Sequence, residues 1–214
     1  MTSNKTLIVS ATEMEISPLT EWLQARGIDV LITGVGMVAT AARTARALAL
    51  TPYDLALNFG LCGSFDRECP PGSVVHVTSD HLVELGAEDG NNFLTVRELG
   101  LQPDNDPPFE EGRILNSDPP ANPALQKLPS VEGITVNTVH GNARSIEAVV
   151  RRFLPQVESM EGAAFMFACA TADVPYAQVR AVSNFVEPRN RAAWKIEEAI
   201  AALDRAARDI LGSL

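Results

Sequence analysis

Residues 32–64, ITGVGMVATAARTARALALTPYDLALNFGLCGS, decide which fold class the chain belongs to. A glycine turn at residues 33–36 follows a short apolar run, and an Ala-, Leu- and Arg-rich stretch of helical period extends from Val38 to Leu50. A second apolar run begins near Asp54 and ends in another glycine-rich turn at residues 58–64. A strand, a helix and a second strand, joined by short turns, are typical of α/β proteins.

The same alternation continues along most of the chain. Short β-branched runs predict strands near residues 6–10, 29–33, 54–59, 73–78, 133–139 and 176–182. Helices fill most of the gaps, including 38–50, the small-residue stretch after 159 and about 194–211. We predict an α/β fold in a single domain, residues 1–214, because no linker or charge run divides the chain and its length suits one core.

The alternation breaks down between about residues 86 and 128. Proline removes a backbone donor and ends helices, so strands or helices in this segment must be short. We predict that residues 86–128 form a flap or an edge insertion. The prolines that support this prediction lie among acidic residues, at Pro103, Pro107, Pro108, Pro119, Pro120 and Pro123.

Charge and cysteine content limit the partners and the compartment. The 214 residues carry a formal net charge of -10 at pH 7, and the isoelectric point is about 4.8. Nucleic acids and anionic membranes bind basic surfaces, so the acidity argues against both and favours a small molecule. Cys62, Cys69 and Cys169 are odd in number and lack metal-ligand spacing, which predicts reduced thiols, no metal site and a cytoplasmic location. The apolar run at 7–9 is too short for a signal peptide or membrane span.

Two polar residues at the ends of predicted elements are candidates for a binding site. Glu161, in the run ESMEG at 158–162, starts a small-residue helix, and Asn184 follows the apolar strand that ends near Val182. An ionised carboxylate accepts hydrogen bonds on two oxygens, so Glu161 can hold two hydroxyl groups of a ribose. The amide of Asn184 can recognise a heterocyclic base. The pair predicts a site for a nucleoside.

The glycine-rich turns allow more than one interpretation. The turn at 33–36 superficially satisfies the glycine fingerprint of a dinucleotide site. In dinucleotide-binding folds the glycines follow the first strand, and an acidic residue ends the second strand. Here the turn follows the second strand, and Asp54 precedes the third. Backbone amides facing a pocket, or close packing of helix on sheet, are therefore favoured over NAD binding. The turn containing Gly63 lies at a strand end, where ligands gather in open α/β sheets, but a tight turn alone explains it equally well.

Glu15 is a candidate base for cleaving an N-ribosidic bond. A carboxylate just after a strand is most often a helix-start residue that the helix dipole favours. With Glu161 it would bring a second carboxylate to the same pocket, where one acid holds hydroxyls and the other faces the reacting carbon. We therefore predict that Glu15 activates water.

Other candidate residues carry weaker signals. Arg189 and Arg191 are most simply surface residues, but in so acidic a chain they could pair with a carboxylate of the substrate. Met160 and Phe185 are more often core residues, although either could pack on the face of a sugar. The histidines have no metal spacing, and we predict structural roles for His76, His81 and His140.

These motifs together resemble the nucleoside phosphorylase and nucleosidase superfamily, whose members share a central mixed sheet wrapped by helices. The resemblance covers residues 8–19, 33–64 and 157–184, which is most of the chain outside the 86–128 segment. It implies this mixed-sheet architecture. It also implies a homo-oligomer, a dimer or larger, in which neighbouring chains complete or cover the site.

The resemblance also implies roles for single residues. Met160 and Glu161 occupy the place of the family's ribose-binding Met-Glu, and Ser183 and Asn184 occupy the end of its base-recognition strand. Glu15 falls where the hydrolytic nucleosidases place the carboxylate that activates water. No metal or organic cofactor is implied.

Two departures from the family pattern predict the subtype. Phosphorylases bind phosphate through an arginine and a serine where this chain has Asn58 and Leu61, so a phosphate dianion would lack its partners. Adenine-specific nucleosidases end the base strand in Ser-Asp, whereas this chain has Ser183-Asn184. Because an amide can donate to N7 and to a 6-oxo oxygen, hypoxanthine or guanine suits it better than adenine.

The run 183–191 followed by Trp194-Lys195-Ile196 most resembles the branch of the superfamily that hydrolyses futalosine, an inosine-like nucleoside with a carboxyphenyl ketone on its 5' side. The resemblance implies release of hypoxanthine in menaquinone biosynthesis and gives Arg189 and Arg191 a carboxylate to bind, although Arg144 competes for it. The enzymatic alternatives are a purine nucleoside phosphorylase and a methylthioadenosine or aminodeoxyfutalosine nucleosidase. The alternative without catalysis is a nucleoside- or dinucleotide-binding module.

Overall fold

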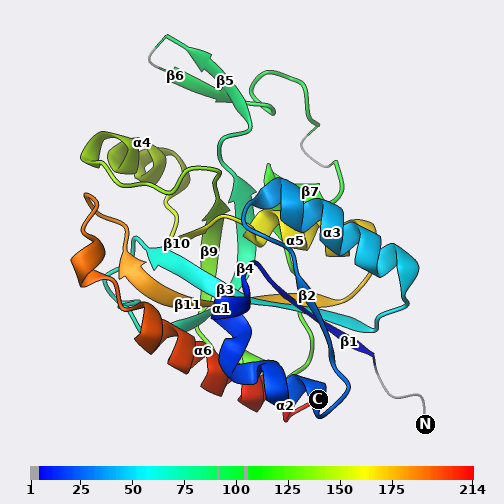
Figure 1. The fold of residues 1–214 in the computed structure, drawn as a ribbon. Coiled ribbons are helices and arrows are strands. Elements are labelled where there is room, and N and C mark those ends of the chain that lie inside the picture. Colours follow the sequence, from blue (N-terminus) through cyan, green and yellow to red (C-terminus); the bar gives the residue numbers. More distant parts are fainter. Residues whose placement is uncertain (1–4, 91, 104–105) are drawn as a thin grey trace.

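A mixed β-sheet with helices packed on both faces forms the framework of the protein (Figure 1). The computed structural model describes residues 5–90, 92–103 and 106–214. Residues 1–4, the polar start of the chain, lie outside this part. The predicted α/β class and the mixed central sheet are confirmed.

Strands and helices alternate along the chain as the sequence pattern predicts. The strands of the described residues are β1 (Thr6–Ser10), β2 (Asp29–Ile32), β3 (Leu55–Ser64), β4 (Val74–Leu82), β5 (Gly86–Asp89), β6 (Asn92–Thr95), β7 (Phe109–Glu110), β8 (Arg113–Leu115), β9 (Ser130–Thr135), β10 (Val157–Ser159) and β11 (Tyr176–Phe185). The α-helices are α1 (Glu13–Ile16), α2 (Thr20–Gln24), α3 (Met37–Leu50), α4 (Ala143–Phe153), α5 (Gly162–Thr171) and α6 (Ile196–Leu211). Short 3-10 turns lie at Ser17–Leu19, Leu125–Lys127 and Arg191–Ala193.

Strand order brings distant parts of the sequence together at one end of β3. The main sheet has the order β2-β1-β3-β10-β9-β4-β8-β7, and β11 pairs with both β3 and β4. β1 and β11 run parallel to β3, whereas β10 pairs with its last two residues in the antiparallel direction. As a result β3, β11, β4, β9 and β10 form a closed ring of strand pairings. The end of β3 is therefore bordered by segments from three other parts of the chain.

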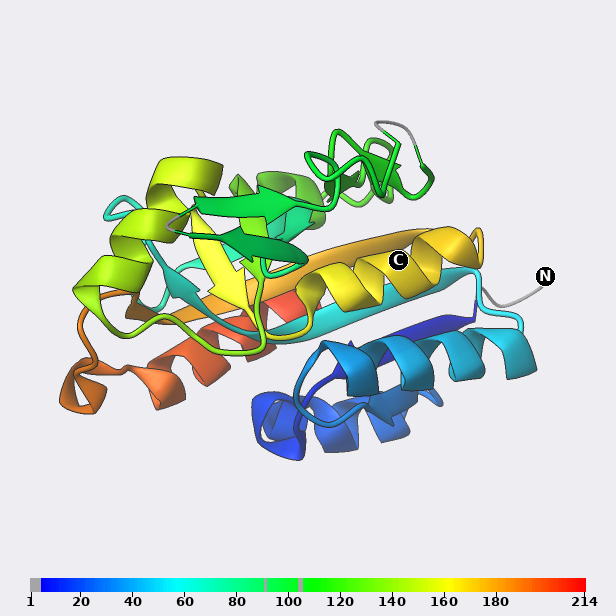
Figure 2. The same cartoon turned by 90° about the horizontal axis from the view of Figure 1, so that it is seen from above.

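Each face of the sheet carries its own apolar core. On one face, Leu57 and Phe59 of β3 belong to a buried cluster with Leu23 and Leu203, which α2 and α6 contribute. On the opposite face, Phe165 of α5 belongs to a second cluster, and α3 packs beside α5 (Figures 1 and 2). The periodic apolar residues of α6 explain its position, because Leu203 and Ile210 share the buried side of that helix.

Several boundaries differ from the prediction. β4 reaches Leu82 rather than 78, and β11 reaches Phe185 rather than 182, so Asn184 lies within that strand instead of after it. β3 continues to Ser64 rather than ending near 59, because Gly60 and Gly63, residues that usually weaken strands, remain in its ladder. β9 spans 130–135 rather than 133–139, and the next β-branched residue, Val136, is buried by packing with Val149 of α4. β10 has only three residues and was not predicted. The segment after β9 is consequently free to form a loop that leads to α4.

The described part of the 86–128 segment contains no element longer than four residues. β5 and β6 form a separate hairpin, which stands away from the main sheet near α4 (Figures 1 and 2). β7 and β8 instead extend the edge of the main sheet through β4. Within the described residues, no helix is long and apolar enough to cross a membrane.

Candidate active site

Glu161, the residue before α5, is a buried carboxylate with two separate protein partners. Its Oε1 accepts a hydrogen bond of 3.0 Å from the N–H of Gly36, and its Oε2 lies 3.7 Å from Nη1 of Arg180. Burial raises the pKa of Glu161, while Arg180 and the Gly36 N–H act in the opposite direction. The arrangement fixes the orientation of a carboxylate that can accept further hydrogen bonds from hydroxyl groups.

The contact with Gly36 explains the glycine turn at residues 33–36. Gly34 and Gly36 have φ angles of 80° and 97°, a backbone region that favours glycine. The turn thereby directs the N–H of Gly36 at the side chain of Glu161. This amide is therefore occupied by a protein carboxylate and is not available to a pyrophosphate.

Glu15 combines a structural role with a position at the same site. It forms a capping box with Thr12, whose N–H and Oγ1 each lie 2.9 Å from Glu15 Oε2. Its Oε1 accepts a hydrogen bond of 3.0 Å from the N–H of Leu61 in β3. The helix-start role is confirmed, and the catalytic role of Glu15 stays a prediction. Because Oε1 has a single donor, one of its lone pairs remains available.

Arg180 forms an ion pair with Glu161 and borders the same glycine, Gly60, as Glu15, and the sequence analysis assigned it no role. The side chain is completely buried in β11, where Nη2 donates to Asn58 Oδ1 at 2.6 Å and Nε donates to Gln178 Oε1 at 3.0 Å. Nη1 is buried and has no hydrogen-bond partner within the described residues. The signal that could have revealed it is a charged residue inside an apolar strand, since buried charges are rare unless paired.

A chain of polar side chains continues from Arg180 through the core to the start of α5. Gln178 donates from Nε2 to Asp80 Oδ2 at 3.1 Å, and Thr135 donates from Oγ1 to Asp80 Oδ1 at 2.9 Å. Thr135 Oγ1 also accepts the N–H of Ala163 at 2.7 Å. Burial raises the pKa of Asp80 to about 6, against the opposing effect of these donors. The chain connects β11, β4, β9 and α5 beneath the candidate site.

Two glycines make room for this network. A Cβ on Gly60 would overlap Arg180 Nη1 and would lie 3.1 Å from Glu15 Oε1. A Cβ on Gly162 would overlap Gln178 Oε1 and Asp80 Oδ2. These positions need glycine because neighbouring side chains occupy the space that a Cβ would require. The surface of Gly60 therefore borders both the free N–H of Arg180 and the available oxygen of Glu15.

Asn184 and Ser183 lie at a bulge where β11 passes the end of β3. Asn184 Oδ1 lies 2.8 Å from Ser183 Oγ, and Asn184 Nδ2 donates to the carbonyl of Phe185 at 2.9 Å. A Cβ on Gly63 would lie 3.4 Å from Asn184 Nδ2 and too close to Val186. Gly63 thus allows the segment after β11 to pack against β3, and one N–H of the Asn184 amide is left for a ligand.

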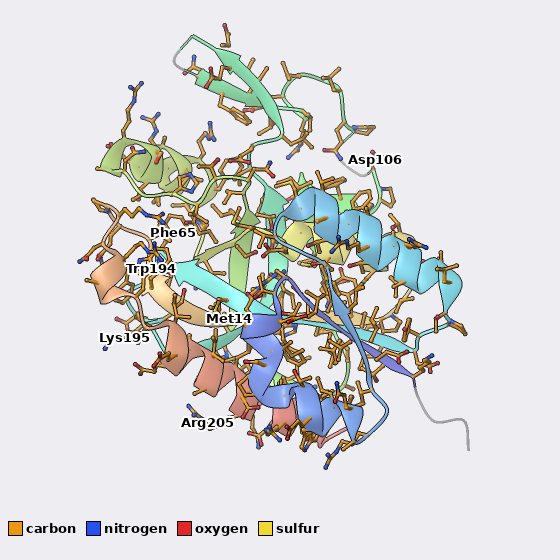
Figure 3. All side chains as sticks on the ribbon, viewed as in Figure 1. Met14, Phe65, Asp106, Trp194, Lys195 and Arg205 are labelled. Atoms are coloured by element: carbon orange, nitrogen blue, oxygen red, sulfur yellow. The ribbon has the colours of Figure 1, made fainter. Side chains whose placement is uncertain are left out.

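The remaining predicted residues occupy different surroundings. Met160 is half-buried and directly precedes Glu161. The guanidinium of Arg67 lies over the ring of Phe185, 4.1 Å from the ring centroid. Arg189 and Arg191 are exposed, and both guanidinium groups lie over the ring of Trp194, at 5.2 and 5.9 Å from its centroid. Trp194 is labelled in Figure 3, beside Lys195, whose N–H donates to the carbonyl of Ser183.

The residues that replace the phosphate ligands of phosphorylases are occupied by contacts within the protein. Asn58 is buried, donates from Nδ2 to the carbonyl of Val9 at 2.9 Å and accepts from Arg180. The N–H of Leu61 is bound to Glu15. Nor does any group of three or more His, Cys, Asp or Glu side chains in the described residues have the geometry to hold a metal ion.

Comparison with known proteins identifies the family. The family model described as "Phosphorylase superfamily" matches residues 20–213. The chain belongs to the phosphorylase superfamily. Within the superfamily it is similar to a futalosine hydrolase of Streptomyces coelicolor, with 39% identity over 190 residues that cover 83% of this chain and 75% of that protein. It is also similar to a futalosine hydrolase of Thermus thermophilus, with 33% identity over 195 residues, 88% of this chain and 83% of that protein.

The same superfamily fold appears in solved structures. The 5'-methylthioadenosine/S-adenosylhomocysteine nucleosidase of Colwellia psychrerythraea, solved in complex with adenine, superposes with a TM-score of 0.78 at 21% identity, covering 99% of this chain and 96% of that chain. This likeness supports the fold. The identities to the curated relatives support a futalosine hydrolase-like member of the superfamily.

The buried network yields a prediction about stability. Arg180→Met keeps most of the side-chain volume but leaves Glu161, Asn58 and Gln178 without their buried donor. We expect the free energy of unfolding, measured by urea denaturation, to fall by about 3–5 kcal/mol, the usual cost of removing one partner from a buried ion pair.

The control is Lys5→Met, which removes an exposed pair with Asp29. This control should cost about 1 kcal/mol or less, because exposed ion pairs contribute little. Equal losses in the two variants would contradict the structural importance assigned to Arg180.

Proposed function

We propose that the protein hydrolyses the N-ribosidic bond of futalosine and releases hypoxanthine, a step that the family resemblance assigns to menaquinone biosynthesis. The observation that carries the proposal is the pair of carboxylates, Glu15 and Glu161, held around Arg180 at the end of β3. The side chain of Asn58 and the backbone N–H of Leu61 are hydrogen-bonded within the protein and are not available to phosphate, which supports hydrolysis rather than phosphorolysis. The names and identities of the curated relatives support futalosine as the substrate.

Glu161 binds both hydroxyl groups of the ribose in the proposed mechanism. Its carboxylate is already oriented by Gly36 and Arg180, so little ordering is required when the sugar binds. Met160, which precedes it, covers the face of the sugar. Holding the anomeric carbon in one position supplies much of the rate, because the attacking group and the bond to be broken are aligned in advance.

The attacking water binds beside Glu15. There it donates a hydrogen bond to the available lone pair of Glu15 Oε1. Glu15 then takes a proton from this water as its oxygen bonds to the anomeric carbon. The bond pair leaves with N9 of the purine, and no cofactor is needed.

The base and the 5' group are bound by the end of β11 and the segment that follows it. Asn184, oriented by Ser183, donates to the 6-oxopurine as negative charge develops on it. Gly63 and Phe185 shape the floor of the base site. Arg189 and Arg191, which lie over Trp194, bind the carboxylate of the 5' carboxyphenyl group, and the indole supplies an apolar surface for the phenyl ring.

The reaction is tested by incubating the protein with futalosine, inosine or methylthioadenosine, with and without phosphate, and identifying the products by chromatography. We expect hypoxanthine and a free sugar from futalosine, at a rate that phosphate does not change. Release that requires phosphate and yields a sugar 1-phosphate would show a phosphorylase. Adenine from methylthioadenosine as the main product would show the adenine-specific alternative.

The role of Glu15 predicts a specific loss of turnover. Glu15→Gln keeps an acceptor oxygen for Leu61 but cannot take a proton, so kcat should fall about 10²-fold or more while futalosine still binds. Glu13→Gln, an exposed residue of the same helix, is the matched control and should leave kcat unchanged. Calorimetric binding of futalosine to each variant separates catalysis from binding. Unchanged turnover in Glu15→Gln would remove Glu15 from the mechanism.

We also propose that the protein forms a homo-oligomer, a dimer or larger, through the surface beside this site. Met14, Val35 and Val38 are 53%, 56% and 80% exposed and lie next to Glu15 and Gly36 in the chain. Light scattering should give a mass of at least two chains, and Val38→Glu should lower it, because a charge in an apolar interface is costly. Leu101→Glu, at an equally exposed leucine of the 86–128 segment, should not. A monomeric wild-type protein would contradict the proposal.

The cytoplasm is the compartment that we propose. Cys62, Cys69 and Cys169 are all free and buried, which suits a reducing environment. Cell fractionation tests this directly, and recovery of the chain outside the cytoplasmic fraction would contradict it.

A further inference from the structure

His140 and Glu158 form a hydrogen-bonded pair beside the proposed base site. His140 Nδ1 lies 2.6 Å from Glu158 Oε2, and the backbone N–H of His140 donates to Glu158 Oε1 at 3.0 Å. The Glu158 side chain is 4% exposed and that of His140 is 13% exposed. A carboxylate can only accept, so Nδ1 carries the hydrogen of this bond and Nε2 is left for another partner.

Two contacts place this pair at the same end of β3 as Asn184. A Cβ on Gly63 would lie 3.4 Å from Asn184 Nδ2 and 3.6 Å from Glu158 Cγ, so the two side chains border the same glycine. The neighbouring Gly141 accepts a hydrogen bond of 3.0 Å from the N–H of Arg189, which ties the His140 loop to the segment after β11. The His140–Glu158 pair and the amide of Asn184, which we propose binds the base, therefore lie on the same side of the site.

The second ring nitrogen of His140, Nε2, makes no hydrogen bond in the described part of the chain. It is also not one of the fully buried side-chain atoms that lack a partner. The ring contacts Phe65 edge to face, with centroids 6.2 Å apart, and it lines a cavity of about 700 Å³ that includes Arg144 and Ser145. The imidazole is thus bound to Glu158 through Nδ1, and Nε2 remains available to a ligand.

Asn184 alone can stabilise the departing purine only by hydrogen bonding. One of its two N–H groups is bound to the carbonyl of Phe185, and a neutral amide does not transfer a proton. A departing purine gains a full negative charge if nothing protonates it. A proton donor near Asn184 lowers the barrier by neutralising that charge as it forms.

We propose that His140 is the general acid of the reaction and that Glu158 is its positioning residue. The proposal rests on the nucleosidase function proposed above. N9 takes the electron pair of the breaking bond, and Nε2 of the His140 imidazolium gives one proton to a ring nitrogen of the purine. Water adds to the anomeric carbon and gives one proton to Glu15. That proton returns to His140 through solvent, so one water is consumed for each base released.

Several other charged groups lie around the His140–Glu158 pair. Glu84, Glu88, Arg144 and Arg152 line the same cavity, and Arg189 packs against the next residue of the loop. None of these groups has a hydrogen bond to the imidazole among the described residues, whereas the carboxylate of Glu158 does.

The first experiment compares two leaving groups in wild type and His140→Gln. Hypoxanthine needs a proton to leave easily, whereas the nitrophenolate of p-nitrophenyl β-D-ribofuranoside does not. For futalosine, kcat should fall about 10²-fold or more in the variant, the usual contribution of a general acid. For the nitrophenyl riboside, the ratio of variant to wild-type rates should stay near one. An equal loss with both substrates would overturn the assignment, because it would indicate a structural role.

The pH dependence gives a second, independent readout. In wild type, kcat for futalosine should fall at high pH, and this descending limb should be absent in His140→Gln. A descending limb that persists unchanged in the variant would overturn the proposal. His81→Gln is the matched control, since His81 contacts the ring of Phe153 rather than Glu158 and should keep the wild-type profile.

Glu158→Gln tests the positioning role. The amide can still accept from Nδ1, but it cannot balance the charge of the imidazolium, so the loss of kcat for futalosine should be smaller than in His140→Gln. The nitrophenyl riboside should again be unaffected, and a loss with both substrates would contradict a role through His140. Absence of hypoxanthine release by the wild-type protein would instead refute the proposed function itself.

Discussion

The buried guanidinium of Arg180 is the interaction on which the candidate site depends. Three carboxyl groups lie around it. Arg180 contacts Glu161 directly and borders Glu15 across Gly60. It is connected to Asp80 through the side chain of Gln178. Removing charges from water costs several kcal/mol per ion unless partners compensate. One cation and a set of neutral donors supply that compensation here, and burial raises the pKa of Asp80 to about 6. The carboxylates can therefore be close together and still fixed.

This requirement explains the two glycine-rich segments. Each directs one backbone N–H at a buried carboxylate, Gly36 at Glu161 and Leu61 at Glu15. A backbone donor is held by the fold and has no side-chain freedom to lose, so it orients the acid with little entropic cost. The strand ends therefore determine where the acids point. In the proposed reaction, this leaves the oxygens of Glu161 for the sugar and one oxygen of Glu15 for water.

Much of this could be predicted from the sequence. The alternation of apolar runs and Ala-rich stretches gave the α/β class, and the positions of Glu15 and Glu161 at the starts of helices placed both acids at strand ends. Local patterns cannot reveal pairings that depend on closure of the sheet. The short strand β10, the continuation of β3 through Gly60 and Gly63, and the role of Arg180 all arise from contacts between distant segments.

His140 illustrates the same limit at a single residue. From the sequence it was one of three histidines without metal spacing, and a structural role was the reasonable prediction. Its partner Glu158 belongs to β10, whose antiparallel pairing with β3 places that carboxylate next to Gly63. The pairing cannot be inferred from spacing, since 18 residues separate His140 from Glu158. The proposed acid thus became visible only once the sheet had been assembled.

A structure of the Glu15→Gln variant with bound futalosine tests the central claim most directly. We predict that both ribose hydroxyls lie within hydrogen-bond distance of the Glu161 carboxylate, which keeps its contact with Arg180. The purine should lie between Asn184 and His140, and a water should lie within hydrogen-bond distance of the Glu15 side chain. Futalosine bound away from the end of β3, or with its ribose out of reach of Glu161, would contradict the account.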